Sequence, residues 1–187
     1  KRMLAFSSIA HAGYVLVAVV VGSASAISGV IFYSIAYAVM GTGAFGILTI
    51  RDVGRVPQTY DDLAGYGKRN PFQALMMTLF MFSLIGLPLT GGFIGKLQIF
   101  SAALDGGWVW LTVIGILNSA LSAYYYLRVV MFMYMREGAL PEGTDLSGRS
   151  SGFALTGLIG TAVAVLYLGV FPDKIIELAS SSIQALL

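Results

Sequence analysis

One apolar run, from Pro71 to Leu104, limits what this chain of 187 residues can fold into more than any other stretch. Lys96 is the only ionisable residue in it. As one continuous helix the run would be about 51 Å long, whereas the hydrocarbon core of a membrane is about 30 Å thick. The run must therefore either tilt steeply or break.

The sequence around Lys96, SLIGLPLTGGFIGK, favours a break. Pro88 lacks a backbone N–H and disfavours helical conformation at Leu87. Four glycines loosen the same region: Gly86, Gly91, Gly92 and Gly95. A break exposes backbone amides and carbonyls, which hydrocarbon tolerates only where protein or a water-filled cavity satisfies them. We therefore expect a discontinuous helix around Leu87–Lys96.

Lys96 lies close to the middle of the membrane in this arrangement, about 13 Å from Asp105 along the helix axis. A charge at that depth costs at least about 2.5–3.5 kcal/mol. Lysine, unlike arginine, can escape this cost by releasing its proton. Since ionisable residues inside membranes mark ion pathways, Lys96 is a candidate proton carrier. The alternative is that its amine snorkels to the interface along the apolar stem.

The composition indicates a polytopic membrane protein, with 57% hydrophobic and 11% charged residues. The absence of cysteine and the presence of a single histidine exclude thiol redox chemistry, iron–sulfur ligation and Cys/His zinc sites. No phosphate-binding loop motif follows a strand-like run. We therefore expect no cofactor and no metal on this chain. Lys1 and Arg2 do not begin a signal peptide, and we expect the chain to be the carboxy-terminal part of a longer protein.

The apolar segments predict an all-α, polytopic transmembrane helix bundle of five spans within one domain. Eight Lys and Arg residues of the connectors fall on one side of the predicted bundle and only Lys174 falls on the other. This bias makes the first side cytoplasmic and the carboxyl end external. The spans cover about residues 3–21, 27–50, 71–104 (the broken one), 108–135 and 152–171, and an amphipathic tail covers 172–187.

Polar residues inside the other spans are further candidates. His11 and Tyr14 share one helix face with Ser7 and Ser8, and such a stripe could line a wet path. Equally, His11 could be a neutral histidine that is hydrogen-bonded to a neighbouring helix. In the second span Tyr33, Tyr37, Gly41 and Ala44 repeat at similar spacing, where the small residues favour packing. In the fourth span the candidates for a structural or relay role are Asn118, Tyr125 and Arg128. Arg128 could also snorkel to the cytoplasmic side.

Four segments together closely resemble antiporter-like subunit N of proton-pumping NADH–quinone oxidoreductase, respiratory complex I. They are KRMLAFSSIAHAGY, GTGAFGILTI, SLIGLPLTGGFIGK and SAYYYLRVV. By this resemblance the spans are helices ten to fourteen of a fourteen-helix subunit. Lys96 would match the lysine of the broken twelfth helix, at the outlet end of the second half-channel. Lys1 would match a lysine towards the cytoplasmic side of the hydrophilic axis, whereas His11 matches no defining family residue.

The resemblance implies a proton-translocating, non-redox membrane-arm subunit of the oxidoreductase in a bacterial plasma (inner) membrane. The complex would use NADH, FMN, iron–sulfur clusters and quinone on other subunits. The partners would be neighbouring antiporter-like and small membrane subunits and the lipid bilayer, with no nucleic acid. Two alternatives stay open. One is a subunit of a multisubunit sodium/proton antiporter, and the other is a structural assembly subunit in which Lys96 merely pairs with a neighbour.

Overall fold

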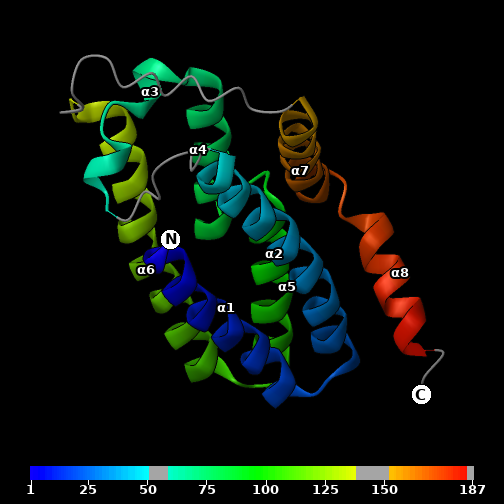
Figure 1. Cartoon of the computed structure of the whole chain (residues 1–187). Helices are drawn as coiled ribbons and strands as arrows, with labels where there is room; N and C mark the ends of the chain where they lie inside the picture. Colours follow the sequence, from blue (N-terminus) through cyan, green and yellow to red (C-terminus); the bar gives the residue numbers. More distant parts are fainter. Residues whose placement is uncertain (51–58, 138–151, 185–187) are drawn as a thin grey trace.

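The computed structural model describes residues 1–50, 59–137 and 152–184, and within these ranges the regular structure is entirely helical. Within these ranges, eight α-helices and one short 3-10 helix follow one another (Figure 1). Their bounds are α1 Arg2–Val21, α2 Ala24–Ile50, η1 Asp61–Leu63, α3 Tyr66–Arg69, α4 Pro71–Ile85, α5 Gly91–Asp105, α6 Val109–Met135, α7 Gly152–Val170 and α8 Asp173–Gln184.

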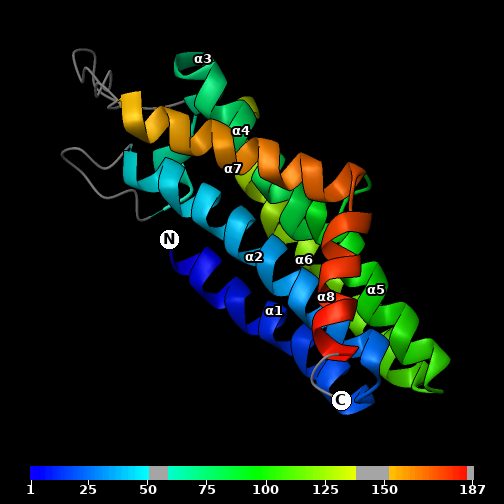
Figure 2. The ribbon, with the colours of Figure 1, turned by 90° about the vertical axis from the view of Figure 1, so that its right-hand side faces the viewer.

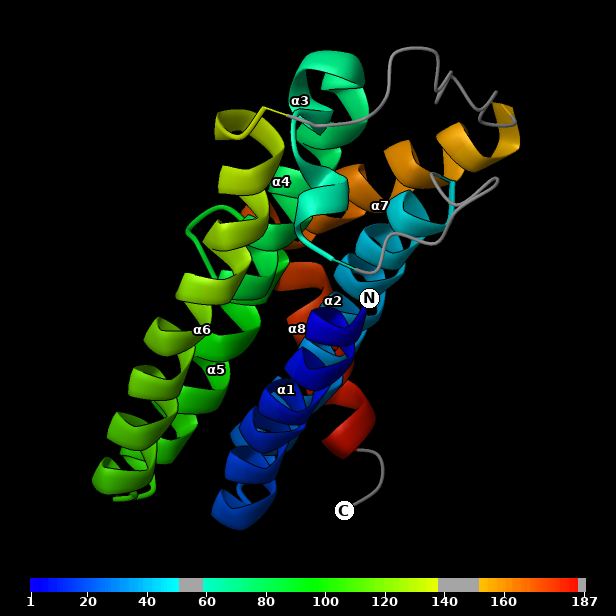
Figure 3. The same ribbon diagram turned by 60° about the vertical axis from the view of Figure 1, so that its left-hand side comes forward.

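Helix α2 lies at the centre of the bundle and contacts α1, α4, α5, α7 and α8. Helices α1 and α5 run alongside it, and α6 packs on α1, α4 and α5 (Figures 1 and 3). Helices α7 and α8 cover α2 one after the other (Figure 2). Leu158 of α7 packs near Gly46, and Ser180 of α8 is hydrogen-bonded to Ser28, with 3.2 Å between the hydroxyl oxygens. The predicted tail therefore packs on its own chain.

Four helices, α1, α2, α6 and α7, are long and apolar enough to cross a membrane. Their bounds lie close to the predicted spans. The first connector is shorter than the predicted Gly22–Ala26, because α2 already begins at Ala24. Helix α1 ends at Gly22, which has a φ of 65° and donates its N–H to the carbonyl of Ala18. This left-handed conformation is one that glycine adopts without strain.

The run from Pro71 to Leu104 forms two helices, α4 and α5, of 15 residues each. Each is about 22 Å long, which is less than the hydrocarbon thickness of about 30 Å. Helix α4 ends at Gly86, whose φ of 90° turns the chain and whose N–H bonds to the carbonyls of Phe82 and Ser83. The non-helical residues 86–90 are called the linker below. Thr90 closes it by donating its hydroxyl to the Leu87 carbonyl at 2.7 Å.

The helices are held together by a large apolar core in the middle of the bundle and at the end where α1 begins, and by two smaller clusters towards the other end. Small residues bring the backbones close. Gly43 of α2 lies against the ring of Phe80, and a Cβ there would be 2.2 Å from that ring's Cζ. Ala179 of α8 is buried where this helix lies beside α2.

Candidate functional site

Lys96 is buried in the first turns of α5, with 5% of its surface exposed. Its Nζ donates to the carbonyl oxygens of Leu84, at 3.0 Å, and Ile85, at 2.8 Å. It also lies 2.8 Å from the hydroxyl oxygen of Ser119 on α6. All three partners can accept a hydrogen bond, so the site satisfies all three N–H donors of an ammonium group.

The interruption of the helix is what makes these carbonyls available. In a continuous helix, the N–H of residue 88 would bond to the carbonyl of Leu84, and that of Leu89 would bond to Ile85. Pro88 has no N–H, and the turn at Gly86 takes Leu89 away from its helical position. The Lys96 amine occupies the place of these missing donors.

The glycines of this region allow close approach. A Cβ on Gly86 would lie 3.1 Å from Lys96 Cδ, and one on Gly92 would lie 1.9 Å from the carbonyl oxygen of Ser83. A Cβ on Gly95 would lie 2.6 Å from the Tyr33 ring, and one on Gly91 would lie 2.9 Å from a side-chain atom of α7. Pro88 itself is exposed. These glycines therefore place the Lys96 backbone against α4, α2 and α7.

A second buried polar group lies between α1, α2 and α6; we call it the His11 cluster (Ser7, His11, Tyr33 and Tyr126). His11 Nδ1 lies 2.5 Å from the Tyr33 hydroxyl, and its Nε2 lies 2.9 Å from the Tyr126 hydroxyl. The Tyr126 hydroxyl also contacts the Ser7 hydroxyl. A neutral imidazole donates from one nitrogen and accepts at the other, and a tyrosine hydroxyl can do either. The cluster can therefore reverse the direction of its hydrogen bonds without moving heavy atoms.

Tyr14 lies between the His11 cluster and Lys96. Its ring centroid is 5.7 Å from the His11 ring and 4.9 Å from Lys96 Nζ. Asn118 Nδ2 lies 3.5 Å from the Tyr14 hydroxyl, at the outer limit of a hydrogen bond. Tyr125 is half-buried, and its ring packs on Tyr126 with the centroids 4.5 Å apart. The structure thus brings His11, Tyr14, Lys96 and Asn118 into one region, with Tyr125 beside it.

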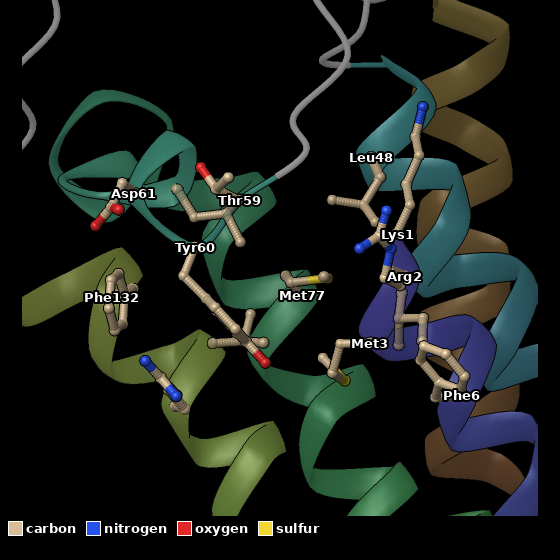
Figure 4. A pocket seen from close by; sticks show the side chains of 14 residues that line it. Lys1, Arg2, Met3, Phe6, Leu48, Thr59, Tyr60, Asp61, Met77 and Phe132 are labelled. Atoms are coloured by element: carbon tan, nitrogen blue, oxygen red, sulfur yellow. The ribbon is translucent and has the colours of Figure 1, made fainter.

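Lys1 lies apart from this region, on a cavity of about 450 Å³ near the amino-terminal end of α1 (Figure 4). Arg128 lines the same cavity, and its guanidinium carbon is 4.8 Å from the centroid of the Tyr60 ring and 5.6 Å from that of Phe132. Arg128 thus packs against the connector between α2 and α4. Burial raises the pKa of Tyr60, and the positive charge of Arg128 partly offsets this effect, so Tyr60 stays protonated near neutral pH.

Lys96 lines a second cavity, of about 390 Å³, between α5 and α6. This cavity extends along α5 past Phe100 and Ser101 to Leu104, which is next to the end of the helix. Ser119 also lines it. The cavity therefore runs from Lys96 towards the end of α5.

Sequence reasoning did not single out Tyr126, Tyr33 or Ser119 as partners of the candidate residues. A usable signal exists for Tyr126: Ser119, Ser122 and Tyr126 are spaced by three and four residues, which puts them on one helix face. Asn118, Ser122 and Tyr125 have an equivalent spacing, so the pattern excludes only Tyr124 from the run Tyr124–Tyr126. Tyr33 could not be selected in this way, because its partner His11 lies on another helix.

In the described ranges, no group of three or more His, Cys, Asp or Glu residues is placed to hold a metal ion. The polar groups brought together are instead hydroxyls, one imidazole, one amine and backbone carbonyls. These groups can bind and pass protons through hydrogen bonds.

The family of transmembrane proteins described as "NADH:quinone oxidoreductase/Mrp antiporter, TM" matches residues 1–122. The chain belongs to this family. Among its relatives, "NADH-quinone oxidoreductase subunit N 1" of Solibacter usitatus is 48% identical over 97% of this chain. "NADH-quinone oxidoreductase subunit N" of Trichlorobacter lovleyi is 45% identical over 98% of the chain. The predicted resemblance is confirmed, and the fold is that of a multi-pass helical membrane protein.

Solved structures agree with this family. A chain of respiratory complex I from Thermus thermophilus, with bound aureothin, superposes on 95% of this chain with a TM-score of 0.80 and 33% identity. A chain of the Mrp complex from a Dietzia species superposes on 95% with a TM-score of 0.82, and at 24% identity it shows the fold alone. The chain spans 37% of the length of the two curated relatives and 39% of the Thermus chain.

Proposed function

We propose that this chain is the carboxy-terminal part of an antiporter-like subunit of NADH–quinone oxidoreductase, and that it carries half of a proton path with Lys96 as the proton-binding group. The observation that carries the proposal is the Lys96 amine, which is buried at the linker and held by two freed carbonyls and Ser119. The curated relatives that match over nearly the whole chain are named as subunits of that oxidoreductase.

The geometry supports a direction for this path. The cavity at Lys1 would admit protons at the cytoplasmic end, and the His11 cluster would relay them by reversing its hydrogen bonds. Tyr14 lies next on the way to Lys96, and water would carry the proton past its ring. The cavity between α5 and α6 would release protons towards the external side.

Lys96 would alternate between a charged and a neutral form during turnover. The charged form donates to both carbonyls and to Ser119. In the neutral form the amine has two donors and one lone pair, and the Ser119 hydroxyl can turn to donate to that lone pair. Ser119 therefore suits both forms. In this reading α4 and α5 together make one discontinuous span, and the chain performs no electron transfer.

The test replaces Lys96 in the complete protein, within the assembled membrane complex. Lys96→Met keeps the apolar stem and removes the charge, whereas Lys96→Arg keeps a charge that cannot be released. We expect both variants to assemble and to lose coupled proton uptake by at least about 100-fold, as expected when a proton-transfer group is removed. Lys174→Met, an exposed lysine on α8, is the matched control and keeps uptake at the level of the parent.

Proton uptake into membrane vesicles and NADH–quinone turnover are both measured, alongside the amount of assembled complex. If Lys96→Arg behaves like the parent, a fixed positive charge is sufficient and the carrier role is wrong. If both variants pump normally, Lys96 has no part in transport. A loss of assembled complex without a change in pumping per complex would instead support the structural role.

A second candidate function is a subunit of a multisubunit sodium/proton antiporter. The family that matches this chain is described by both kinds of complex, and the Dietzia Mrp chain shares the fold. Purification of the parent complex separates the two. Co-purification of iron–sulfur and quinone-binding subunits supports the oxidoreductase, and a purely membrane-embedded set of subunits supports the antiporter. We place either complex in a bacterial plasma membrane, since the relatives are bacterial.

A further inference from the structure

The backbone of the linker has an unusual conformation at Leu89. Among the described residues, Leu89 is the only non-glycine residue with a positive φ, which is 70°. This conformation costs about 1–2 kcal/mol for a residue with a Cβ. Its side chain is 67% exposed, so side-chain burial does not hold it there. Strained backbone persists only where surrounding structure fixes it, and the contacts of the backbone itself must supply that constraint.

The last turn of α7 supplies the contact. A Cβ on Gly169 would lie 2.2 Å from the carbonyl oxygen of Leu89 and 2.5 Å from Thr90 Cα. Only glycine lets two backbones approach so closely. The neighbouring Leu168 packs against Gly91, the first residue of α5. The end of α7 therefore lies directly on the end of the linker and on the start of the helix that carries Lys96.

The other end of the linker touches Lys96. Gly86 lies against the lysine side chain, and the carbonyls of Leu84 and Ile85 directly before it accept from the amine. The linker is only five residues long, and Thr90 ties its end back to Leu87 by a hydrogen bond. A displacement at Leu89 is therefore passed on to the residues that hold the amine.

We propose that Gly169 is a positioning residue for Lys96: its backbone contact with Leu89 fixes the linker and thereby the carbonyls that bind the amine. Helix α7 carries no ionisable side chain except that of Tyr167, and on this proposal it nevertheless sets the proton affinity of a site on another helix. The expected change in proton uptake rests on the proposed function. The claim that Gly169 fixes the linker rests only on its contact with Leu89.

The test is Gly169→Ala in the complete, assembled complex. Gly157→Ala and Gly160→Ala on the same helix are matched controls, because a Cβ at either position meets nothing within 4 Å. Hydrogen–deuterium exchange is measured on the peptide that covers residues 86–90, and proton uptake is measured as a function of pH. We expect Gly169→Ala to speed exchange in this peptide and to shift the pH midpoint of uptake by about one unit, as a change of proton affinity at one site does. Both controls should match the parent.

A rescue variant guards against simple misfolding. Leu89→Gly removes the strained side chain and lets the linker backbone move away from an added methyl group. The double variant Leu89→Gly/Gly169→Ala should therefore assemble like the parent, and its pH midpoint should stay shifted, because the contact that fixes the linker is still lost.

If hydrogen–deuterium exchange in residues 86–90 is unchanged in Gly169→Ala, Gly169 does not fix the linker and the proposal is wrong. If exchange is faster but the pH profile of uptake is unshifted, Gly169 does not position the groups that bind Lys96. A lower amount of complex with an unshifted profile also overturns the positioning role. The proposed function is tested separately, because it is wrong if Lys96→Met pumps protons normally. In that case hydrogen–deuterium exchange still decides whether Gly169 fixes the linker.

Discussion

At the scale of single residues, the sequence predicts the buried lysine but not the groups that bind it. Lys96 stands out because one charge in a long apolar run is costly. Its acceptors are two carbonyls and Ser119, and no sequence motif identifies a backbone carbonyl as a ligand. His11 likewise stands out by residue type. Its partners Tyr33 and Tyr126 come from two other helices, so only the packing of the bundle reveals them.

The run of three tyrosines on α6 provides a sharp test of the His11 cluster. Tyr126 is fully buried, and its hydroxyl contacts both Ser7 and His11. Tyr126→Phe removes this partner from the Ser7 hydroxyl and from Nε2 of His11, and we expect it to lower the stability of the assembled subunit by about 1–3 kcal/mol. The thermal melting of the purified complex measures this loss, and proton uptake should fall as well.

Tyr124→Phe is the control, since Tyr124 lies two residues away on the same helix and is 71% exposed. We expect it to melt and to pump like the parent. Equal effects of the two substitutions would contradict the placement of Tyr126 in the cluster.

At the scale of helices, breaks and ends follow from local rules, whereas contacts between helices do not. Helix α4 ends at Ile85, next to Gly86 and Pro88, and these two residues act on their own backbone. The contact of Gly169 with Leu89 joins residues that are 80 positions apart in the sequence. Nothing in the pattern of α7 distinguishes Gly169 from Gly160, because what separates them is the presence of another backbone nearby.

Two glycines of α2 provide a matched test of close helix packing. Gly43 lies against the ring of Phe80, whereas a Cβ on Gly41 would meet nothing within 4 Å. Gly43→Ala should therefore force α2 and α4 apart and cost about 1–3 kcal/mol of stability, as overpacking does in other cores. Gly41→Ala should leave the melting temperature unchanged. If the two variants have the same melting temperature, α2 and α4 do not pack as closely as described.

At the scale of the whole molecule, composition is sufficient to predict a polytopic helical membrane protein. The ends of α1, α2, α6 and α7 lie within a few residues of the predicted spans, because the apolar length of a span is a property of the sequence itself. The packing of α8 along α2 was not predictable, since an amphipathic helix can use its apolar stripe on a lipid surface, another subunit or its own chain. The predicted connector between the second and third spans begins at residue 51, and its residues 51–58 lie outside the described ones.

The orientation of the bundle is a prediction that labelling can check. These 187 residues contain no cysteine, so an introduced cysteine is the only one in this stretch and reports one position. Lys68→Cys, beside α4, should react with a membrane-impermeant maleimide only from the cytoplasmic side. Asp105→Cys, at the end of α5, should react only from the outside. Labelling of both residues from the same side would disprove the topology that the basic residues predict. Labelling of each residue from the side opposite to the expected one would invert it.

The neutral surroundings of Lys96 have an electrical consequence. Its described partners are two carbonyls and a hydroxyl, none of which carries a charge. Loading a proton there adds one elementary charge at about half the depth of the membrane. A transmembrane voltage of about 100 mV is worth about 2.3 kcal/mol for a full crossing, and so roughly half of that for this step. On the proposed function, the occupancy of Lys96 would therefore depend on the membrane voltage, and the voltage that pumping builds up would change how readily this lysine takes up the next proton.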